Sequence, residues 1–447
     1  MKKGMFFALA ASSLLFSACS SDDAVVSTEG QNEAVQQIVL QVASSGDGLT
    51  TRAGRPLYSS EALQTIQNVR VVIYNADTKE IVKDATQDWT KSTTYNNHGH
   101  GRQFTLTFKG NDRLEKGNYK VMAVGYSNES DYEYSLNATS AVGLTYNDIT
   151  ATLKAGKKEA EEVFAGDADL KIGDDKKITN LTSGEENGVA VTLHRQVAGS
   201  FGYFQNIPAS VNGKAAATLR LVVRDKNDVL TFNNFNSSFT ANGATGSTIK
   251  YYVNGSKSTS AATADAKFNN NEDGYVLYSI DLSKWFTEGD KNKDGLLNAE
   301  DTWQHPSSVN TQVVKGSVFG SNFVIPFNYA KGKSTMELQL LDAENNIIKT
   351  WTVSIPKDDV NTDTANGVTD ASTSIFNVVR NHMYNLGVKT SNGTKPDPSN
   401  PDPKPTDPDP DKPKPGTDEP EDLSKSQNLI LKVNDNWEAI HKMELGD

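Results

Sequence analysis

The chain has one cysteine, Cys19, among its 447 residues. A single thiol cannot form an internal disulfide, so no disulfide framework supports the fold. The sequence also lacks a Gly-x-Ser-x-Gly nucleophile motif, a phosphate-binding loop and a dinucleotide-binding fingerprint. We therefore expect a protein that is not an enzyme. An exported hydrolase stays open as an alternative, because carboxylate pairs can form among the 56 acidic residues.

Positive charge is outnumbered, because 44 lysine and arginine residues stand against 56 aspartate and glutamate residues. The formal net charge is -12 at pH 7. Nucleic-acid phosphates require a basic surface, so the composition argues against a nucleic-acid partner. The acidic excess is typical of an exported protein that has to stay soluble.

A long apolar run is missing too. The amino terminus has two lysines followed by an apolar stretch from Met5 to Phe16, about a dozen residues, which is too short to span a bilayer and is typical of a signal peptide. Residues 16–19, Phe-Ser-Ala-Cys, resemble a bacterial lipobox. This predicts that residues 1–19 form a lipoprotein signal and that Cys19 is acylated, palmitate included. An ordinary signal peptide with an incidental cysteine is the alternative.

Short runs with high β propensity, separated by Asn, Asp and Gly, follow one another along the chain. They predict an all-β fold of two antiparallel β-sandwich domains in tandem, transthyretin-like or Greek-key in style, over residues 53–185 and 186–390. One short helix is expected at residues 157–164. The expected strands are residues 69–74, 103–108, 119–126, 189–197, 217–223, 274–280, 336–341, 348–353 and 376–388.

One strand pattern occurs twice, at residues 37–42 and 428–433. Side chains alternate along a strand, so each copy presents three apolar residues on one face. The two copies are therefore expected to fit the same slot, the second replacing the first. The pairs are Ile38 with Leu429, Leu40 with Leu431, and Val42 with Val433, and the apolar face continues in the tail (residues 426–447) through Trp437, Met443 and Leu445.

Arg52 follows the first copy in a polar, glycine-bearing stretch of the kind that proteases reach. Cleavage between Arg52 and Ala53 would remove residues 20–52 as a propeptide together with the first strand. Arg55 is a poorer site because Pro56 follows it. The chain can thus lose its first copy of the strand and keep its second.

Proline is concentrated in one place. Ten of the 15 prolines lie between Lys395 and Pro420. Such a tract favours an extended polyproline II conformation with a rise of about 3.1 Å per residue, so we expect residues 391–425 to form a stiff linker. This linker would present the tail to a neighbouring molecule as a donor strand. Two alternatives stay open: a plain surface spacer, and a tail that folds back on its own subunit.

Residues 290–301 match a twelve-position calcium loop with glycine at position six. Calcium prefers six to eight oxygen ligands, and the loop offers five oxygen-bearing side chains and a backbone carbonyl. The pattern predicts a structural Ca2+ site, and a surface turn without an ion is the alternative. The expected ligands are Asp290, Asn292, Asp294, Leu296 through its carbonyl, Asn298 and Asp301.

His98 and His100 have a spacing that can bind metal, but they lie in a glycine-rich stretch with no acidic residue nearby. A flexible exposed loop is the better interpretation there. His194 and His382 lie within expected strands and are interpreted as structural residues.

Taken in order, these features resemble the shaft subunits of type V pili, the fimbrillins of Gram-negative anaerobes, and among them most of all the major subunit of minor fimbriae. The resemblance depends on the lipobox, on the Pro-Asp linker with its Trp-containing tail, and on residues 51–54, 191–198 and 378–384.

The resemblance implies a precursor that is lipid-anchored in the cell outer membrane and trimmed after arginine by a trypsin-like, Arg-specific protease. It further implies polymerisation with other copies of the chain and related fimbrial subunits by donor-strand exchange, giving an extracellular fimbrium that supports adhesion. A non-polymerising surface lipoprotein that binds glycan or protein is the alternative.

Overall fold

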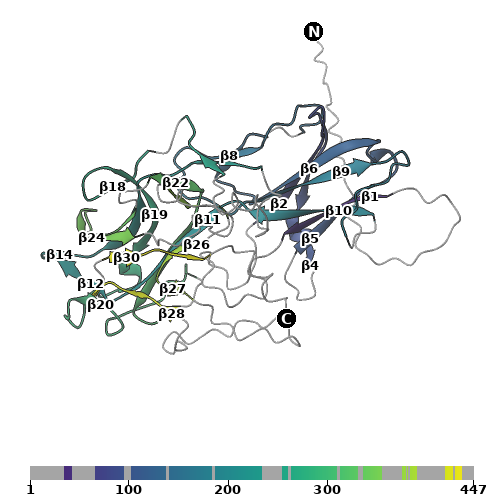
Figure 1. The fold of residues 1–447 in the computed structure, drawn as a ribbon. Helices are drawn as coiled ribbons and strands as arrows, with labels where there is room; N and C mark the ends of the chain where they lie inside the picture. Colours follow the sequence, from purple (N-terminus) through teal and green to yellow (C-terminus); the bar gives the residue numbers. More distant parts are fainter. Residues whose placement is uncertain are drawn as a thin grey trace, which may run out of the picture.

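The structure is a computed structural model. It describes residues 35–42, 66–94, 102–136, 140–183, 187–233, 254–259, 263–309, 313–330, 336–354, 375–378, 380, 383–389, 418–425 and 428–434. Within these ranges the chain forms strands, and its only helical segments are three 3-10 turns: η1 (Trp89–Lys91), η2 (Gly110–Asp112) and η3 (Leu282–Lys284). The predicted all-β fold with two sandwich domains in tandem is confirmed (Figure 1).

The first sandwich has two sheets that share a core. Side chains of high β propensity on alternate positions fill this core, among them Val69, Val71, Val121 and Leu193. One sheet has the order β3 (Ile81–Asp88), β2 (Asn68–Asn75), β6 (Gly117–Tyr126), β9 (Phe164–Ile172). The other has the order β10 (Gly188–Arg195), β1 (Gln36–Val42), β5 (Arg102–Phe108), β4 (Thr93–Thr94).

The two sheets meet where β9 pairs with β10, at Phe164 with Arg195 and at Ala165 with His194. The next residue of β9 is Gly166. A Cβ atom built there would lie 2.0 Å from the Thr192 carbonyl oxygen. The close approach of the two strands therefore requires glycine.

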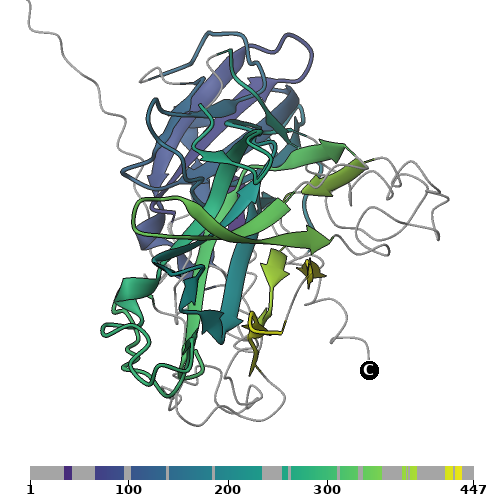
Figure 2. The ribbon, with the colours of Figure 1, turned by 90° about the vertical axis from the view of Figure 1, so that its left-hand side faces the viewer.

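The second sandwich follows directly along the chain, and Figure 2 shows it below the first. Its core is rich in aromatic residues, including Phe201, Tyr203 and Trp351. One sheet has the order β21 (Ser317–Val324), β11 (Ala198–Gln205), β26 (Met383–Leu386), β31 (Lys432–Asn434), with β29 (Glu421–Asp422) also on β11. The other has the order β18 (Ala266–Lys267), β19 (Asp273–Asp281), β15 (Thr218–Val223), β23 (Met336–Leu341), β24 (Ile347–Ser354), β30 (Asn428–Ile430).

Short strands complete the fold. A four-stranded sheet links the domains, because β8 of the first pairs with β16 of the second. Its order is β17 (Gly255–Ser256), β16 (Val229–Thr231), β8 (Thr150–Leu153), β7 (Tyr132–Tyr134). Four pairs remain: β12 (Ile207–Pro208) with β20 (Leu296–Leu297), β13 (Ser210–Val211) with β14 (Lys214–Ala215), β22 (Phe327–Ala330) with β25 (Ile375–Val378), and β27 (Val388–Lys389) with β28 (Asp418–Glu419).

The domain boundary differs from the one expected at residues 185 and 186. β10 belongs to the first sandwich because it pairs with β1, so the second sandwich begins at β11. The two domains also share one apolar cluster, in which Val72 and Met122 of the first domain join Phe201 and Leu219 of the second. The domains therefore pack as one body.

The predicted helix at residues 157–164 is wrong. Tertiary packing overrides the helix propensity of its glutamate-rich sequence. Ala160 forms a bridge with Phe323 of the second sandwich. Val163 and Phe164 are fully buried, and Glu162 forms a buried ion pair with Arg195 at 2.7 Å.

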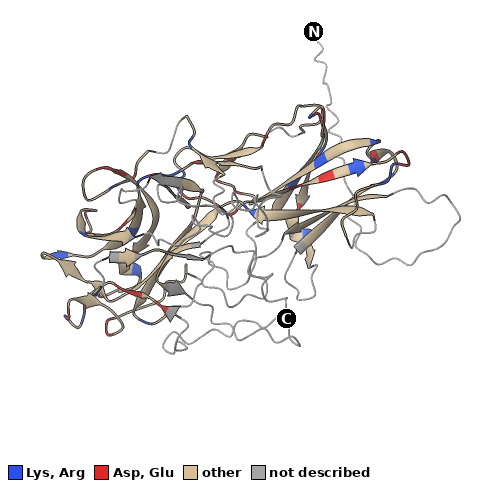
Figure 3. Cartoon of the chain, viewed as in Figure 1, with Lys and Arg blue, Asp and Glu red and all other residues tan. Residues whose placement is uncertain are grey.

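Charged residues are dispersed over the strands and loops that the structure describes. Figure 3 shows lysine and arginine interspersed with aspartate and glutamate instead of forming a continuous basic stripe.

We predict that Gly166→Ala lowers the free energy of unfolding by about 1–3 kcal/mol, because the new methyl group meets the backbone of Thr192. Denaturant unfolding of the full chain measures this change. The control is Lys171→Ala on the exposed side of the same strand, which should stay within about 0.5 kcal/mol of the parent. Equal effects of the two substitutions would contradict the close approach of β9 and β10.

Candidate functional site

β1 is an interior strand of the first sandwich. It pairs antiparallel with β5 over all seven of its residues and in parallel with β10 over six of them (Figure 1). In this register Ile38 lies opposite Val189 and Leu106. Both edges of β1 therefore carry backbone hydrogen bonds, and its loss would leave β5 and β10 with unpaired facing edges.

The inner face of β1 is part of the core. Ile38 and Leu40 are fully buried and pack in the same cluster as Leu106, Phe108 and Val191. Val42 lies opposite Leu193 in the ladder. The predicted displaced-strand residues thus line a slot whose walls are β5 and β10.

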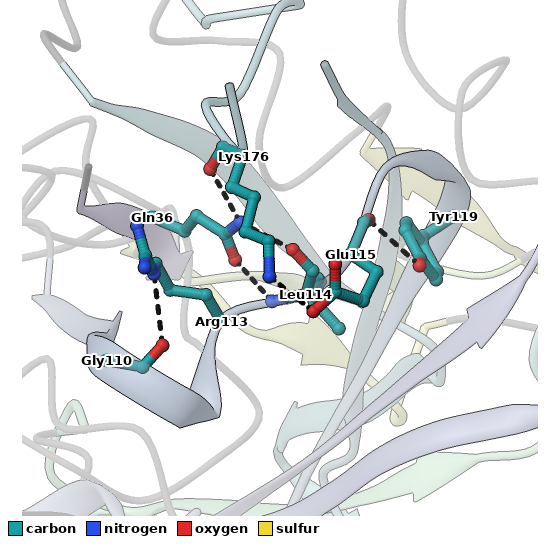
Figure 4. Close-up of polar contacts among 7 residues, drawn as sticks. All are labelled: Gln36, Gly110, Arg113, Leu114, Glu115, Tyr119 and Lys176. Carbon is teal, nitrogen blue, oxygen red and sulfur yellow. Dashed lines mark hydrogen bonds and ion pairs between the residues drawn. The ribbon is translucent and has the colours of Figure 1, made fainter. Parts of the chain in front are cut away.

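Gln36 begins the same inner face and is 1% exposed. Figure 4 shows its side-chain amide between two loops. The amide nitrogen donates to the Leu114 carbonyl at 2.9 Å and to the Lys176 carbonyl at 2.8 Å. The amide oxygen accepts from the Leu114 backbone N–H at 2.8 Å. One side chain thus satisfies three buried or partly buried backbone groups at the end of the slot.

The surroundings hold these loops in place (Figure 4). Arg113 donates to the Gly110 carbonyl at 3.0 Å, and the Tyr119 hydroxyl donates to the Glu115 carbonyl at 3.0 Å. Burial raises the pKa of Tyr119, and the negative charge of Glu115 adds to this shift. The phenol is therefore protonated at neutral pH and remains a donor. Across the loops, Lys176 forms an ion pair with Glu115.

The tail strands dock on the second sandwich of their own chain. β30 pairs in parallel with β24, and β31 pairs antiparallel with β26. Leu429 and Leu431 are both 0% exposed and join the apolar cluster of that domain. The two copies of the strand pattern therefore occupy different domains in this structure, and residues 428–434 are folded back on their own subunit.

The end of the predicted linker is also docked on the body. β28 pairs antiparallel with β27, so Val388 lies opposite Glu419 and Lys389 opposite Asp418. Leu423 is fully buried. The two ends of the proline-rich segment thus meet, and residues 418–425 belong to the second sandwich instead of the linker. Pro420 is the one proline among residues 418–425, so the other backbone N–H groups of this stretch can enter ladders.

Asp422 fastens this docked end. Its carboxylate accepts from Asn206 at 3.0 Å and from the Ser424 hydroxyl at 2.6 Å, and Lys425 lies 2.9 Å away. Burial alone would raise the pKa of Asp422, but hydrogen bonds from these three side chains outweigh it and lower the pKa to about 2. The carboxylate is therefore charged at neutral pH, as its donors require.

The predicted calcium loop closes on itself. The Gly295 N–H donates to Asp290 at 2.9 Å, and Gly295 has a φ of +87° that suits glycine. Asp301 is 7% exposed, and its two oxygens accept from the backbone N–H groups of Lys291 at 2.9 Å and Asn298 at 3.0 Å. The last ligand position therefore lies against the first turn of the loop.

The other side chains that the pattern predicts as metal ligands also contact one another. Asn298 donates to Asp294 at 2.7 Å, and Asn292 donates to the same carboxylate at 3.1 Å. One oxygen of Asp290 is buried and has no hydrogen-bond partner. Leu296 and Leu297 form β20, which pairs with β12 and anchors the loop to the second sandwich. The predicted ligand residues thus lie in one closed loop, in which the amide oxygens of Asn292 and Asn298 accept from the backbone N–H groups of Asp294 and Glu300. A hard cation would require both amides to turn their oxygens toward the carboxylates.

These donors include amides and a backbone carbonyl. Among the residues the structure describes, no group of three or more His, Cys, Asp or Glu side chains is gathered closely enough to hold a metal ion. The carboxylates of Asp290, Asp294 and Asp301 therefore do not form a metal site by themselves. An ion in this loop would depend on Asn292, Asn298 and the Leu296 carbonyl.

Several predicted residues lie outside the described ranges: Cys19, Arg52, Ala53, His98, His100, His382, Trp437, Met443 and Leu445. For Val42 and Val433 only the backbone pairing is described. His194 lies in β10, as its strand pattern predicts. Within the described ranges, no helix is both long and apolar enough to cross a membrane.

Two features escaped the sequence interpretation, namely the role of Gln36 and the docking of Leu423 with Asp422. A signal existed for the first, because Gln36 stands two residues before Ile38 and so shares its inward face. For the docking of Leu423 and Asp422, the only indication in the sequence was that the proline-rich tract ends before them. A polar side chain at an inward position is a sign of a buried hydrogen-bond site.

No protein-family model matches the chain, and no curated protein does. Among solved structures, the chain is similar to the tip fimbrial protein Mfa3 from Porphyromonas gingivalis, at 9% identity and a TM-score of 0.34 over 79% of this chain and 94% of that one. It is similar to a fimbrial assembly protein from Parabacteroides distasonis, at 13% identity and a TM-score of 0.34 over 81% and 93%.

A third similar structure is the fimbrial anchor protein Mfa2 from Porphyromonas gingivalis, at 9% identity and a TM-score of 0.32 over 79% of this chain and 90% of that one. All three are fimbrial proteins by description. Identities and TM-scores at this level carry no conclusion about function.

We predict that Leu40→Ala lowers the free energy of unfolding of the uncut chain by about 2–5 kcal/mol, because it empties part of a packed core. Urea denaturation measures the loss. Gln41→Ala, on the other face of β1, should change stability by less than about 0.5 kcal/mol. A stable Leu40→Ala chain would mean that β1 contributes little to the first sandwich.

Proposed function

We propose that the chain is a structural subunit of a cell-surface fimbrium and that it supports adhesion. It is exported as a lipoprotein through Cys19, trimmed between Arg52 and Ala53 by an Arg-specific protease, and polymerised by donor-strand exchange. Its partners are other copies of the chain and related fimbrial subunits, and its lipid anchors the precursor in the outer membrane before trimming.

The observation that carries this proposal is the position of β1. It is an interior strand encoded before the expected cleavage site, so proteolysis would remove a strand from the middle of a sheet. The opened slot would expose Leu106, Val189 and Val191, which are buried in the intact chain. Unpaired strand edges beside exposed apolar side chains bind another strand strongly.

The tail supplies a strand of the required pattern. Aligned on Ile38 and Leu429, the donor repeats an apolar residue at each apolar inward position of β1. It would run in the same direction, parallel to β10 and antiparallel to β5. The donor would replace the ladders of β1 with β5 and β10 and its inward aliphatic side chains by groups of the same kind. Exchange would therefore restore most of the pairing and burial that trimming removes.

The donor has to leave its own subunit first. In the intact chain Leu429 and Leu431 are buried in the second sandwich, and both β30 and β31 are three residues long. These short ladders compete with the long double ladder of β1, in which seven residues pair with β5 and six with β10. A vacated slot on another subunit therefore offers the tail more backbone pairing than its own domain does.

We predict that an Arg-specific protease converts the purified full chain into SDS-resistant ladders, because trimming opens the slot in every subunit. Arg52→Gln should abolish the ladders and leave the monomer folded. The readouts are gel electrophoresis and amino-terminal sequencing, which should find Ala53 first.

Arg55→Gln is the matched control for this test and should polymerise like the parent chain. A trimmed parent chain that stays monomeric would overturn the proposal. Ladders that form equally well from the Arg52→Gln chain would show that the cut lies elsewhere.

The second candidate is a non-polymerising surface lipoprotein that binds glycan or protein. The observation that favours it is the docking of the tail on its own second sandwich. In that case the trimmed chain stays a monomer whose tail remains docked on its own second sandwich. The protease experiment would then give a single monomer band on the gel instead of ladders.

We also propose that residues 290–301 bind a structural Ca2+ ion. The support is the closed loop, the buried oxygen of Asp290 without a partner, and oxygen donors at the predicted positions. When bound, the ion would supply positive charge to the three carboxylates of the loop. Asp290, Asp294 and Asp301 would balance that charge, and β20 would transmit the added rigidity to β12.

We predict that calcium raises the melting temperature of the full chain, because a ligand that binds only the native state stabilises it by mass action. A free concentration of about 100 times Kd gives about 2.7 kcal/mol. Asp294→Ala should remove the shift. Glu344→Ala, an exposed carboxylate outside the loop, is the control and should retain it. A calcium response that Asp294→Ala leaves unchanged would place the ion elsewhere.

A further inference from the structure

The slot of β1 ends in a polar recognition site. We propose that the three backbone groups bound by Gln36, here called the glutamine socket (Leu114 N–H, Leu114 C=O and Lys176 C=O), select the donor strand and fix its register by binding Gln427 of another subunit. This inference rests on the proposed strand exchange and names the residue that decides how the donor fits.

The socket is built from backbone atoms at a buried position. Gln36 is 1% exposed, and its three hydrogen bonds measure 2.8 to 2.9 Å (Figure 4). Leu114 is 5% exposed, so its N–H and C=O have little access to water. Trimming would remove Gln36 together with β1. The socket would then hold one donor and two acceptors that need a partner.

Only a primary amide of the right length meets this demand. Glutamine carries an acceptor oxygen and a nitrogen with two donors, and the socket uses all three functions. A glutamate carboxylate accepts but does not donate, so it would face two carbonyl oxygens with no hydrogen between them. Asparagine is shorter by one methylene group. An apolar side chain would leave all three backbone groups unsatisfied.

The tail has a glutamine at the corresponding place. Aligning Ile38 with Leu429 sets Gln36 against Gln427, and both stand two residues before the first buried aliphatic residue. The inward residues of β1 are Gln36, Ile38, Leu40 and Val42, and those of the donor are Gln427, Leu429, Leu431 and Val433. Gln427 itself lies outside the described residues, so the alignment of the two strands alone assigns it to this position.

A polar residue is needed here because apolar pairing alone sets the register weakly. A donor that slides by two residues still presents aliphatic side chains to the core, since strand side chains repeat with period two. Such a slide moves Gln427 out of the socket and buries a different residue against Leu114 and Lys176. The socket therefore distinguishes the correct register from slides that the apolar core tolerates.

The first test measures assembly. The full chain and its Gln427→Ala and Gln427→Glu variants are trimmed with the Arg-specific protease, and ladder formation is followed by gel electrophoresis. Both variants should assemble at least about tenfold more slowly than the parent, because each leaves buried backbone groups without partners. Asn428→Ala is the control, since it takes the outward position of Gln37 and should assemble like the parent.

The second test reads the register directly. Lys432 takes the place of Gln41, which lies opposite Gln103 in the β1–β5 ladder, and a slide by two residues brings it opposite Thr105. Directly opposed residues are close enough for a disulfide, and trimming removes Cys19 with the propeptide. A Lys432→Cys chain with Gln103→Cys should therefore crosslink between subunits, and one with Thr105→Cys should not. Adding Gln427→Ala should allow the Thr105→Cys crosslink.

The outcomes separate the two proposals. Ladders from the parent chain with equal rates and unchanged crosslinks for Gln427→Ala overturn the socket and leave strand exchange intact. No ladders from the trimmed parent chain overturn both. Slow assembly of Gln427→Ala with an added Thr105→Cys crosslink supports the socket.

Discussion

The structure depends on one constraint: an interior strand of a sheet has to be filled. β1 pairs with β10 on one side and with β5 on the other, and its inner face closes the core of the first sandwich. Without it, two ladders and an apolar cluster would be open at once. On the proposed function, cleavage after Arg52 would remove this strand, so proteolysis would control the stability of the first sandwich.

In the second sandwich the tail forms the terminal strand of each sheet instead of an interior one. β30 and β31 cover two strand edges, β24 and β26, and bury two leucines. This docking protects an apolar strand that would otherwise be exposed and prone to association. In the intact chain, β1 therefore fills the first sandwich, and the tail covers the edges of β24 and β26 in the second. On the proposed function, assembly transfers the tail from these short ladders to the longer ladders of the β1 slot in another subunit.

The docked residues 418–425 change how the proline-rich segment is understood. The described residues on either side of it, in β27 and β28, pair with each other on the second sandwich. On the proposed function, its length becomes useful only when β28 and β29 separate from the body. Gly387 supports this arrangement. Its φ is +77°, and a Cβ atom built there would lie 2.5 Å from the Tyr203 carbonyl oxygen, which leaves no room for a side chain.

The sequence alone determined what depends on local pattern. Alternation of apolar residues identified strands such as β2, β5, β6, β15 and β23 and the inward residues Ile38 and Leu40, but β3, β9, β11 and β21 were not expected from it. The tertiary structure decided what depends on long-range contacts: β10 joins the first sandwich, residues 157–164 are not helical, and the tail docks on its own domain. It also gave Gln36 its three partners, because backbone groups 78 and 140 residues away along the chain meet only after the sandwich has formed.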